Sequence, residues 1–564
     1  MKTLRDSVAS GFKMRQSFAG LCGAMALTLG SVASGQTPPS AGSVLAPLKQ
    51  KEELRLPAGH AIVLPARKLH KSGSRLLIPV RHLVIEGNTL LPRAQLALLL
   101  APAEGKTLTL DELNGYVARI TSAYKAAGYP IAYAYLPAQT VRAGKIRVAV
   151  IEPHYDAVTT TGTSRFKAAS AKRTAGVKAG EMVSDGPLDR GLLLLSQTPG
   201  LKIQGILRPG SAPGTTTLEL KRTDLPLTSG SLSLDNHGNT YTGAIMAKAA
   251  ISANDPFGYG SSFSGNFLLS NTGHLKAGEL SALSPDLNNG LRVGVYGSYS
   301  DYHLGGKFAS LNLLGKAQQV GVDLTYPIIL EAKRVLNFRM DVVKNWLTQD
   351  TRSTGLVVNQ RVDLARFSLS GAVTSKTGAT TSASLALALG GLRLTPLAAR
   401  NADAAGPKAA GGFQTLRFQL GRTQAIGQKF SLSANLAGQW SNRNLDSSKK
   451  FYLGGPDGVM SAAVGDGGGD EGVIFHLRLS HALKVAKLTG KLTGSVLSQF
   501  GAIRVNHTPF VGSASPNYRT AGAVGIELNY SQKDWTITAA YVAPAGGNGI
   551  KTGAHLWLKT SFKF

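Results

Sequence analysis

The pattern of hydrophobic and polar residues changes near residue 226. Upstream of that point, one stretch places apolar residues at every third or fourth position, which predicts an amphipathic helix with an apolar face of Leu110, Leu113, Val117, Ile120 and Tyr124. Downstream, short segments alternate between apolar and polar residues with period two, and Gly, Asn, Asp and Ser separate them. The chain is therefore predicted to combine small α/β domains with a much larger β domain.

Period-two alternation is clearest at the C-terminus. One face of the last segment carries Leu556, Leu558, Thr560, Phe562 and Phe564, and the other carries His555, Trp557, Lys559, Ser561 and Lys563. A strand with one apolar and one charged face is typical of a membrane β-barrel with a water-filled interior. At roughly 21 residues per strand and connection, the residues after 225 give about 16 antiparallel strands. A soluble sandwich is the alternative, but it would not usually need so long a stretch with so few interruptions.

The first α/β domain is predicted over residues 77–154. A strand at 83–85 and a helix at 92–100 precede a second helix, which opens with the capping box Thr109-Leu110-Asp111-Glu112 and ends at Gly128. Strands at 131–136 and 145–151 complete the order β-α-α-β-β.

A weaker copy is predicted over residues 155–224, with one helix at 188–197 and strands at 201–207 and 216–220. The predicted fold class is thus an all-β transmembrane β-barrel of about 16 antiparallel strands over 225–564, preceded by two small α/β domains.

The N-terminal residues 1–35 are predicted to be a secretory signal peptide. Four basic residues precede the apolar stretch 18–32, and Ala33-Ser34-Gly35 provides a cleavage site of small residues. The one cysteine of the chain, Cys22, lies inside this stretch, so a disulfide framework is excluded. Residues 36–76 are predicted to be a linker, in which 41–54 form a short helix or remain disordered.

Composition narrows the class of protein further. The 564 residues include 61 Lys and Arg against 32 Asp and Glu, a net charge of +29, and charged residues make up only 16%. This balance excludes a coiled coil and a chain that is disordered by its charge. Both parts of the mature chain are basic, so charge marks no single site. The positive net charge fits a partner such as anionic lipopolysaccharide or another polyanion. A generally basic proteome explains the charge equally well. No nucleic-acid partner is predicted.

Signals for enzyme chemistry are weak. Gly105-Lys106-Thr107 looks like the end of a phosphate-binding loop, but Leu100 stands where that motif needs a glycine. Asp466, Asp470 and Glu471 lie in a glycine-rich loop, where hydrated acids are a simpler explanation than a cation site. The sequence therefore predicts no enzyme, no cofactor and no metal.

Several motifs occur in a fixed order along the chain. The first α/β domain contains Gly128-Tyr129, Leu136-Pro137-Ala138-Gln139 and Gly144 to Glu152; the second contains Leu192-Leu193-Leu194, Pro199-Gly200 and Gly214-Thr215-Thr216; the barrel begins with Asp235-Asn236-His237-Gly238. A later loop lies between Gly454-Gly455-Pro456-Asp457-Gly458-Val459 and Asp470-Glu471-Gly472. Together these motifs resemble the outer-membrane transporters of two-partner secretion, the hemolysin and filamentous-hemagglutinin exporters (TpsB type, ShlB/FhaC/HecB-like).

The resemblance implies site residues. The loop from Gly454 and Gly455 to Asp470, Glu471 and Gly472 would fold into the barrel lumen, and the last aromatics, Phe562 and Phe564, would act as the C-terminal assembly signal. The family's loop reads Gly-Val-Arg, then Gly or Ala and an aromatic, and its Arg meets an Asp on a wall strand. Here Met460 follows Gly458-Val459, and Gln499, two residues before Gly501, replaces the Asp.

Both members of an ion pair are thus missing together. Removing one member of a buried pair costs about 3–5 kcal/mol, whereas removing both can be near neutral. We therefore hypothesise that Met460 and Gln499 meet as a neutral contact that still seats the loop. The alternative is a degenerate, less active or inactive paralogue.

The resemblance also implies a function. Two polypeptide-transport-associated (POTRA) domains in the periplasm would receive an unfolded exoprotein, and the barrel would export it and help to activate or fold it, without a nucleotide. The helix at 41–54 would plug the resting pore. The implied partners are the secreted exoprotein, the outer membrane with its lipopolysaccharide, and the barrel-assembly machinery. The alternatives are a barrel-assembly insertase of the same superfamily and a passive porin.

Overall fold

The computed structural model describes residues 62–63, 76–486 and 488–564. The predicted signal peptide, including Cys22, and the predicted helix at 41–54 lie outside the described residues. Among the helices that are described, none combines the length and apolar character that crossing a membrane requires.

The first α/β domain contains a three-stranded sheet with helices packed on it. Strands β3 (His82–Glu86) and β6 (Lys145–Ile151) pair in parallel, and β5 (Tyr133–Tyr135) pairs antiparallel with β6. The core lies between this sheet and the helices α2 (Arg93–Leu100) and α3 (Leu110–Ala126). The remaining elements are β2 (Leu77–Pro79), η2 (Ala101–Ala103) and β4 (Thr107–Thr109).

The capping box of α3 is confirmed. The Thr109 hydroxyl accepts a hydrogen bond from the Glu112 N–H, and the Glu112 carboxylate accepts one from the Thr109 N–H at 2.8 Å. The predicted strand at 131–136 is wrong at its ends, because only the three residues of β5 pair with β6.

The second α/β domain has a four-stranded sheet in the order β1-β8-β9-β7. Its elements are β7 (His154–Thr161), α4 (Ala168–Ala175), α5 (Asp185–Ser196), β8 (Leu201–Pro209) and β9 (Thr215–Asp224). The fourth strand, β1 (Ile62–Val63), comes from the linker and pairs in parallel with β8. The sequence prediction missed β1, β7 and α4. Among the described strands of these two domains, those with a sheet partner on one side only are β1, β2, β3, β4, β5 and β7.

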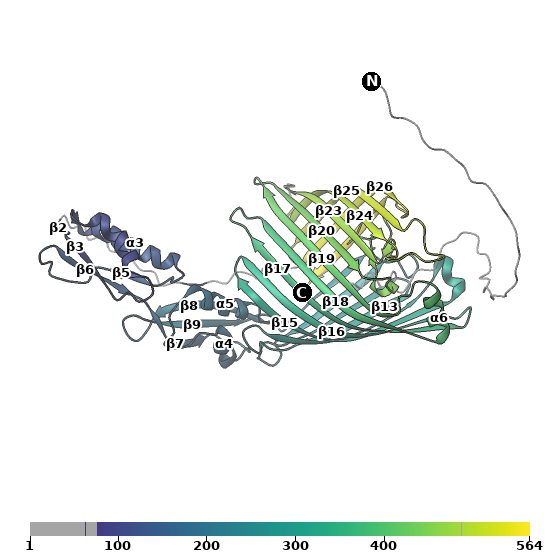
Figure 1. The fold of residues 1–564 in the computed structure, drawn as a ribbon, viewed down its shortest axis with the longest axis horizontal. Helices are drawn as coiled ribbons and strands as arrows, with labels where there is room; N and C mark the ends of the chain where they lie inside the picture. The colour runs from purple at the N-terminus through teal and green to yellow at the C-terminus, as the bar shows by residue number, and fades with distance from the viewer. Residues whose placement is uncertain (1–61, 64–75, 487) are drawn as a thin grey trace, which may run out of the picture. The chain divides into compact units, whose positions relative to one another are not determined.

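Sixteen antiparallel strands form a closed barrel, which confirms the predicted number (Figure 1). In chain order they are β10 (Thr228–Asp235), β11 (Met246–Asn254), β12 (Ser262–Ser270), β13 (Leu275–Leu283), β14 (Arg292–His303), β15 (Leu313–Glu331), β16 (Arg334–Thr351), β17 (Leu356–Thr374), β18 (Thr380–Thr395), β19 (Gly411–Ile426), β20 (Phe430–Ser441), β23 (Glu471–Leu483), β24 (Lys491–Arg504), β25 (Tyr518–Gln532), β26 (Trp535–Asn548) and β27 (His555–Lys563). Helix α6 (Leu397–Ala405) and the short η3 (Gly306–Leu311) lie in connections between strands.

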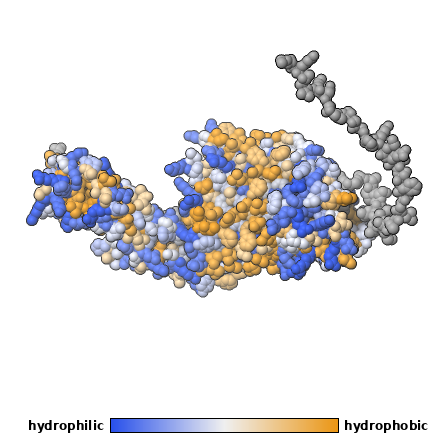
Figure 2. Space-filling view, viewed as in Figure 1, coloured by the Kyte–Doolittle hydropathy of each residue, from blue (hydrophilic) through white to orange (hydrophobic). Residues whose placement is uncertain are grey.

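The alternation of side chains along each strand separates the lipid-facing surface from the lumen. In β27, Leu556 and Leu558 are 53% and 45% exposed, whereas Trp557 between them is 6% exposed. Figure 2 shows hydrophobic residues gathered over the barrel surface, with hydrophilic residues toward its rims. The period-two pattern in the sequence thus places apolar side chains toward lipid, while the inner face carries polar side chains together with apolar clusters.

Strand length varies around the barrel. Strands β10 to β13 and β27 have eight or nine residues, whereas β15 to β17 have 18 or 19. The barrel closes where β10 meets β27, through the register Ser231↔Lys563 to Asp235↔Lys559.

Candidate functional site

The connection between β20 and β23 forms the candidate site. It contains η4 (Ser447–Lys449) and a small hairpin of β21 (Phe451–Tyr452) and β22 (Gly468–Gly469), and its central part packs against residues of the barrel wall. We call residues 442–470 the lumenal loop. Two glycines shape it: Gly455 has φ +113°, and a Cβ on Gly458 would lie 1.8 Å from the Leu453 carbonyl oxygen.

The structure places the tip of the lumenal loop, residues 459–461, against the predicted wall residue Gln499. The Met460 backbone N–H donates to Gln499 Oε1 at 2.8 Å, and the Met460 carbonyl accepts from Trp557 Nε1 at 2.9 Å. Both Met460 and Gln499 are 5% exposed. The Met460 side chain packs in an apolar cluster that includes Leu497 and Trp557. Met460 is therefore fixed both through its backbone and through its thioether side chain.

Further contacts hold the residues on either side of Met460. The Ser461 hydroxyl donates to the Gly522 carbonyl at 2.8 Å, and the Ser461 carbonyl accepts from the Gly553 N–H at 2.8 Å. Val459 is fully buried and packs against Ala521 and Ala523 of β25. The tip is thus bonded to four parts of the barrel: β24, β25, β27 and the connection before β27.

Gly501 provides the space in which the tip sits. A Cβ at Gly501 would lie 2.6 Å from the Leu453 side chain and 2.9 Å from the Val459 side chain. Any larger residue would push these two loop side chains away from β24. Gly501 and Gln499, both predicted as wall partners, therefore contact the loop side by side.

Asp470 anchors the C-terminal end of the loop. Its carboxylate is fully buried, and its Oδ1 accepts from the Leu445 N–H at 3.0 Å and pairs with Lys450 Nζ at 2.8 Å. Its Oδ2 accepts from the His507 N–H at 2.8 Å. The buried charge is thus compensated on both oxygens.

The next two motif residues lie beside this anchor. Glu471 pairs with Arg504 at 3.4 Å and with His507 Nδ1 at 2.7 Å. A Cβ on Gly472 would lie 2.6 Å from the Phe451 ring, so Gly472 allows β21 to approach β23.

Phe562 and Phe564 lie at the closure of the barrel. Gly230 exchanges two backbone hydrogen bonds with Phe564, at 2.9 and 3.0 Å. The Phe562 ring stacks on Phe564 and packs against Trp535. Their backbones and rings therefore belong to the junction of β10, β26 and β27.

Sequence reasoning missed two residues that hold the loop. The alternation places Trp557 only on the wet face of its strand, and Asn239 follows directly after the motif at the start of the barrel. Asn239 Nδ2 donates to the Val464 carbonyl at 2.9 Å, and both residues are buried. The position of Asn239 directly after that motif is the signal by which the sequence could have identified it.

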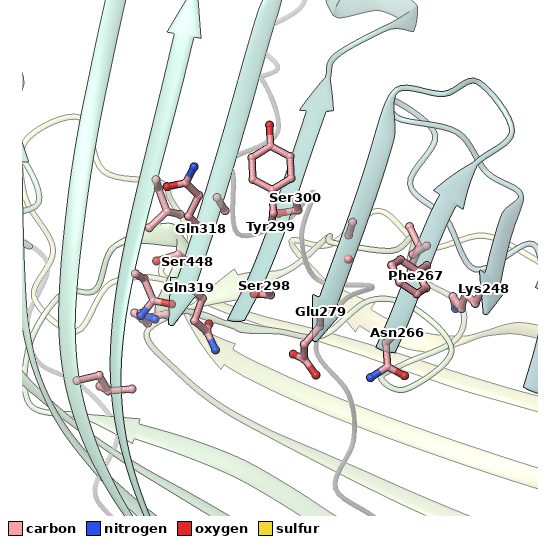
Figure 3. A pocket seen from close by; sticks show the side chains of 18 of the residues that line it. Lys248, Asn266, Phe267, Glu279, Ser298, Tyr299, Ser300, Gln318, Gln319 and Ser448 are labelled. Atoms are coloured by element: carbon pink, nitrogen blue, oxygen red, sulfur yellow. The ribbon is translucent and has the colours of Figure 1, made fainter. Parts of the chain in front are cut away.

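The lumen beside the loop contains a cavity of about 680 Å³. Figure 3 shows Asn266, Glu279, Ser298 and Gln319, which line it from neighbouring strands. Ser448 and Lys449 of the loop line it as well. Within the described ranges, no cluster of His, Cys, Asp or Glu is arranged to hold a metal ion.

A closed barrel with a loop folded into its lumen, preceded along the chain by two small α/β domains, defines a β-barrel protein with POTRA-like domains. Two family models match the chain: "POTRA domain, ShlB-type" at residues 78–153, and "Haemolysin secretion/activation protein ShlB/FhaC/HecB" at residues 214–508. The chain belongs to this second family, the TpsB transporters. It is a two-partner secretion transporter of the outer membrane, which exports a partner exoprotein, and not an enzyme.

Individual relatives agree with this assignment. The heme/hemopexin transporter protein HuxB of Haemophilus influenzae is 24% identical over 503 residues, which cover 88% of each chain. The structure of CdiB from Escherichia coli matches with a TM-score of 0.69 at 16% identity, over 88% of this chain and 93% of that one. BamA from Haemophilus ducreyi, lacking POTRA domains 1–3, matches with a TM-score of 0.53 at 14% identity, over 87% and 100%. The structural matches show a shared fold, and the family match separates this chain from BamA.

Proposed function

We propose that an uncharged contact between Met460 and Gln499 holds the lumenal loop of this transporter in place. With this contact, the transporter still exports its partner exoprotein. The observation that carries the proposal is the 2.8 Å hydrogen bond from the Met460 N–H to Gln499 Oε1. This bond uses the loop backbone, so it needs no charged side chain at position 460. The methionine side chain fills an apolar cluster, where an unpaired arginine would be strongly destabilising.

The completeness of the anchoring supports an active transporter over a degenerate one. The Met460 N–H and carbonyl, the Ser461 hydroxyl and the Ser461 carbonyl each have a partner on the barrel. A loop that had lost its function would not be expected to keep both the wall glycine, Gly501, and a buried acceptor, Gln499, at their positions.

The α/β domains supply edges on which an unfolded exoprotein can dock. An extended segment that adds to a sheet edge gains backbone hydrogen bonds with little demand on its sequence. The edges of β3, β5 and β7 are unpaired among the described strands, and β8 is covered by the short linker strand β1. We propose that the exoprotein enters at these edges before it reaches the lumen.

Two further partners follow from the location in the outer membrane. Phe562 and Phe564 end the closing strand and would be presented to the barrel-assembly machinery before β10 and β27 pair. The net charge of +29 favours contact with anionic lipopolysaccharide.

The test compares culture supernatants and outer membranes by quantitative proteomics in four strains: native, deletion, Met460→Arg, and Met460→Arg with Gln499→Asp. We expect one large secreted protein to disappear on deletion. The single variant should secrete less than the double variant, because an unpaired buried charge costs about 3–5 kcal/mol and the Asp compensates it.

Other results would contradict parts of the proposal. Equal secretion by the single and double variants would refute the pairing of positions 460 and 499. A deletion that leaves the supernatant unchanged would refute active export, and a broad fall in other barrels would indicate an insertase. Heat-modifiable mobility on gels provides the control that each variant has formed a barrel.

A further inference from the structure

Three basic side chains gather on one side of the lumenal cavity. Arg366 on β17, Arg417 on β19 and Lys449 on η4 all line it. The described residues offer no side-chain hydrogen bond or ion pair to Arg366. Over the same described ranges, neither Arg417 nor Lys449 forms an ion pair with a carboxylate. We call these three residues the lumenal basic cluster.

The register of the strands explains how the cluster forms. Arg366 lies opposite Ala388 of β18, and Arg417 lies opposite Ala386 of the same strand. Both alanines line the cavity, so small side chains separate the two arginines. Arg417 lies within electrostatic range of Arg366, and Lys449 within range of both.

A buried glutamine fixes two members of the cluster. Gln439, 3% exposed, accepts from Arg417 Nε at 2.7 Å and donates to the Lys449 carbonyl at 3.1 Å. Its side-chain amide also donates to the Asp470 carbonyl at 3.0 Å. The same side chain therefore holds the Arg417 guanidinium on the wall and the backbone of the lumenal loop at Lys449 in one place.

The acids near the cavity balance the cluster only in part. Asp341 on β16 lies directly opposite Arg366, where it pairs with Arg339 at 3.0 Å. Asp446 acts on Lys449 through space, and Asp457 and Glu279 line the cavity. Glu279 lies on β13, four strands from β17 and six from β19 in the barrel order. Arg417 and Lys449 are like charges close to each other and neither forms an ion pair with a described carboxylate, so a small anion between them would lower their mutual repulsion.

We propose that the lumenal basic cluster is a binding site for a small inorganic anion, of the size of chloride or phosphate. Bound there, the anion links the barrel wall at Arg366 and Arg417 to the loop at Lys449. The site also makes the small-ion permeability of the resting lumen anion-selective. This property is independent of the exported protein and of the contact between Met460 and Gln499.

The first experiment measures anion-dependent stability of the full-length protein in detergent. The midpoint of thermal unfolding is followed in phosphate, chloride and gluconate at equal ionic strength. A ligand that binds only the folded state raises this midpoint in proportion to its occupancy. We expect phosphate or chloride to raise it relative to the bulky gluconate, and the double variant Arg366→Gln with Arg417→Gln to lose the effect. The anion that gives the larger rise identifies the better occupant. Equal midpoints in all three salts would overturn the proposal.

The second experiment measures reversal potentials in planar bilayers under a KCl gradient. We expect the chloride-to-potassium permeability ratio to exceed one and to fall by about twofold or more in Arg417→Gln and in Lys449→Gln. Glu279→Gln, in the same cavity, should raise the ratio. Arg422→Gln is the matched control, because it lies on β19 but faces away from the lumen. Cation selectivity in the native protein, or a change in the same direction for Glu279→Gln and Arg417→Gln, would overturn the proposal.

Discussion

At the scale of single residues, Glu152 ties the first POTRA domain together. Its Oε1 accepts from the N–H groups of Thr89 and Leu90, both at 2.9 Å, and from the Tyr124 hydroxyl at 2.6 Å. Its other oxygen accepts from the Thr89 hydroxyl. Burial opposes ionisation, but the hydrogen bonds from Thr89, Tyr124 and Leu90 outweigh it and hold the pKa of Glu152 below its usual value of 4.5. The ionised form is thus the one the fold stabilises.

This pKa direction predicts how the domain responds to acid. A depressed folded-state pKa gives stability that is present above the unfolded pKa and is lost as the pH falls through the folded one. We expect Glu152→Gln to destabilise the domain by about 1.5–3 kcal/mol at pH 7, the range for a hydrogen bond to a charged group. The difference from the native protein should shrink as the pH falls below 4.5.

Hydrogen exchange of the α3 amides in the full-length protein, corrected for intrinsic exchange rates, measures the free energy of unfolding of the first POTRA domain. The variant Glu112→Gln is the matched control, because it also removes one negative charge from the first POTRA domain. The Glu112 carboxylate caps α3 at the surface. A difference at Glu152 that stays constant from pH 7 to pH 4 would contradict the assignment of the ionised form.

At the scale of elements, β1 covers the edge of β8 in the second POTRA domain. Val63 and Ile206 are opposite each other in this parallel pair, at the spacing of neighbouring strands, about 4.8 Å. That separation suits a disulfide, whose Cα atoms lie about 4.4–6.8 Å apart. The one natural cysteine, Cys22, lies in the predicted signal peptide. A cysteine pair at 63 and 206 should therefore form a single internal crosslink.

We expect this crosslink to lower export of the partner exoprotein, because it prevents an extended segment from replacing β1 on β8. Secretion should recover when a reductant opens the disulfide. The single variants Val63→Cys and Ile206→Cys are the controls. Unchanged secretion with the crosslink formed would place docking at another edge, such as β3, β5 or β7.

Helices show which elements the sequence could predict. Helix α3 has an apolar stripe and a capping box, and both signals locate it correctly. Helix α4 reads Ala-Ala-Ser-Ala-Lys-Arg-Thr-Ala, so its buried face, with Ala171 and Ala175, has no large apolar residue to reveal it. A Cβ on Gly191 of α5 would lie 2.0 Å from the Ala175 carbonyl, so this face is defined by close helix packing, which a single sequence does not display.

Only part of the candidate site could be predicted from the sequence. Its loop and wall motifs could be located, because a family resemblance supplies their order. The placement of Arg366 and Arg417 near each other could not be predicted. Alternation assigns each arginine to a face, whereas only strand register shows that they lie on either side of Ala386 and Ala388 of β18. Register between strands depends on distant pairings and on loop length, neither of which is local in sequence.

At the scale of the whole molecule, Phe564 lies at the place where the barrel closes. Phe564 exchanges two backbone hydrogen bonds with Gly230, beside the short register that joins β10 to β27. We expect Phe564→Ala to lower the fraction of assembled barrel, because its ring packs on Gly230 and Phe562. Those barrels that do assemble should export normally, because the residue is remote in sequence and in contacts from Met460.

Heat-modifiable mobility and outer-membrane content measure assembly, and secretion per assembled barrel measures function. Val511→Ala, at a 98% exposed position in a connection, is a control for truncating an apolar side chain. Normal assembly of Phe564→Ala would contradict the role of this residue as an assembly signal.

The uneven lengths of the strands have a consequence for the lipids around the protein. Nine residues in a strand tilted by about 45° rise about 22 Å, close to the roughly 25 Å apolar band of an outer-membrane barrel. Almost the whole length of β10 to β13 and β27 therefore lies at the level of the acyl chains. Strands β15 to β17 rise about 45 Å by the same geometry and extend well beyond the hydrocarbon. The flank of short strands is thus the part of the wall where a change in bilayer thickness acts first, and each ångström of mismatch there costs a fraction of a kcal/mol.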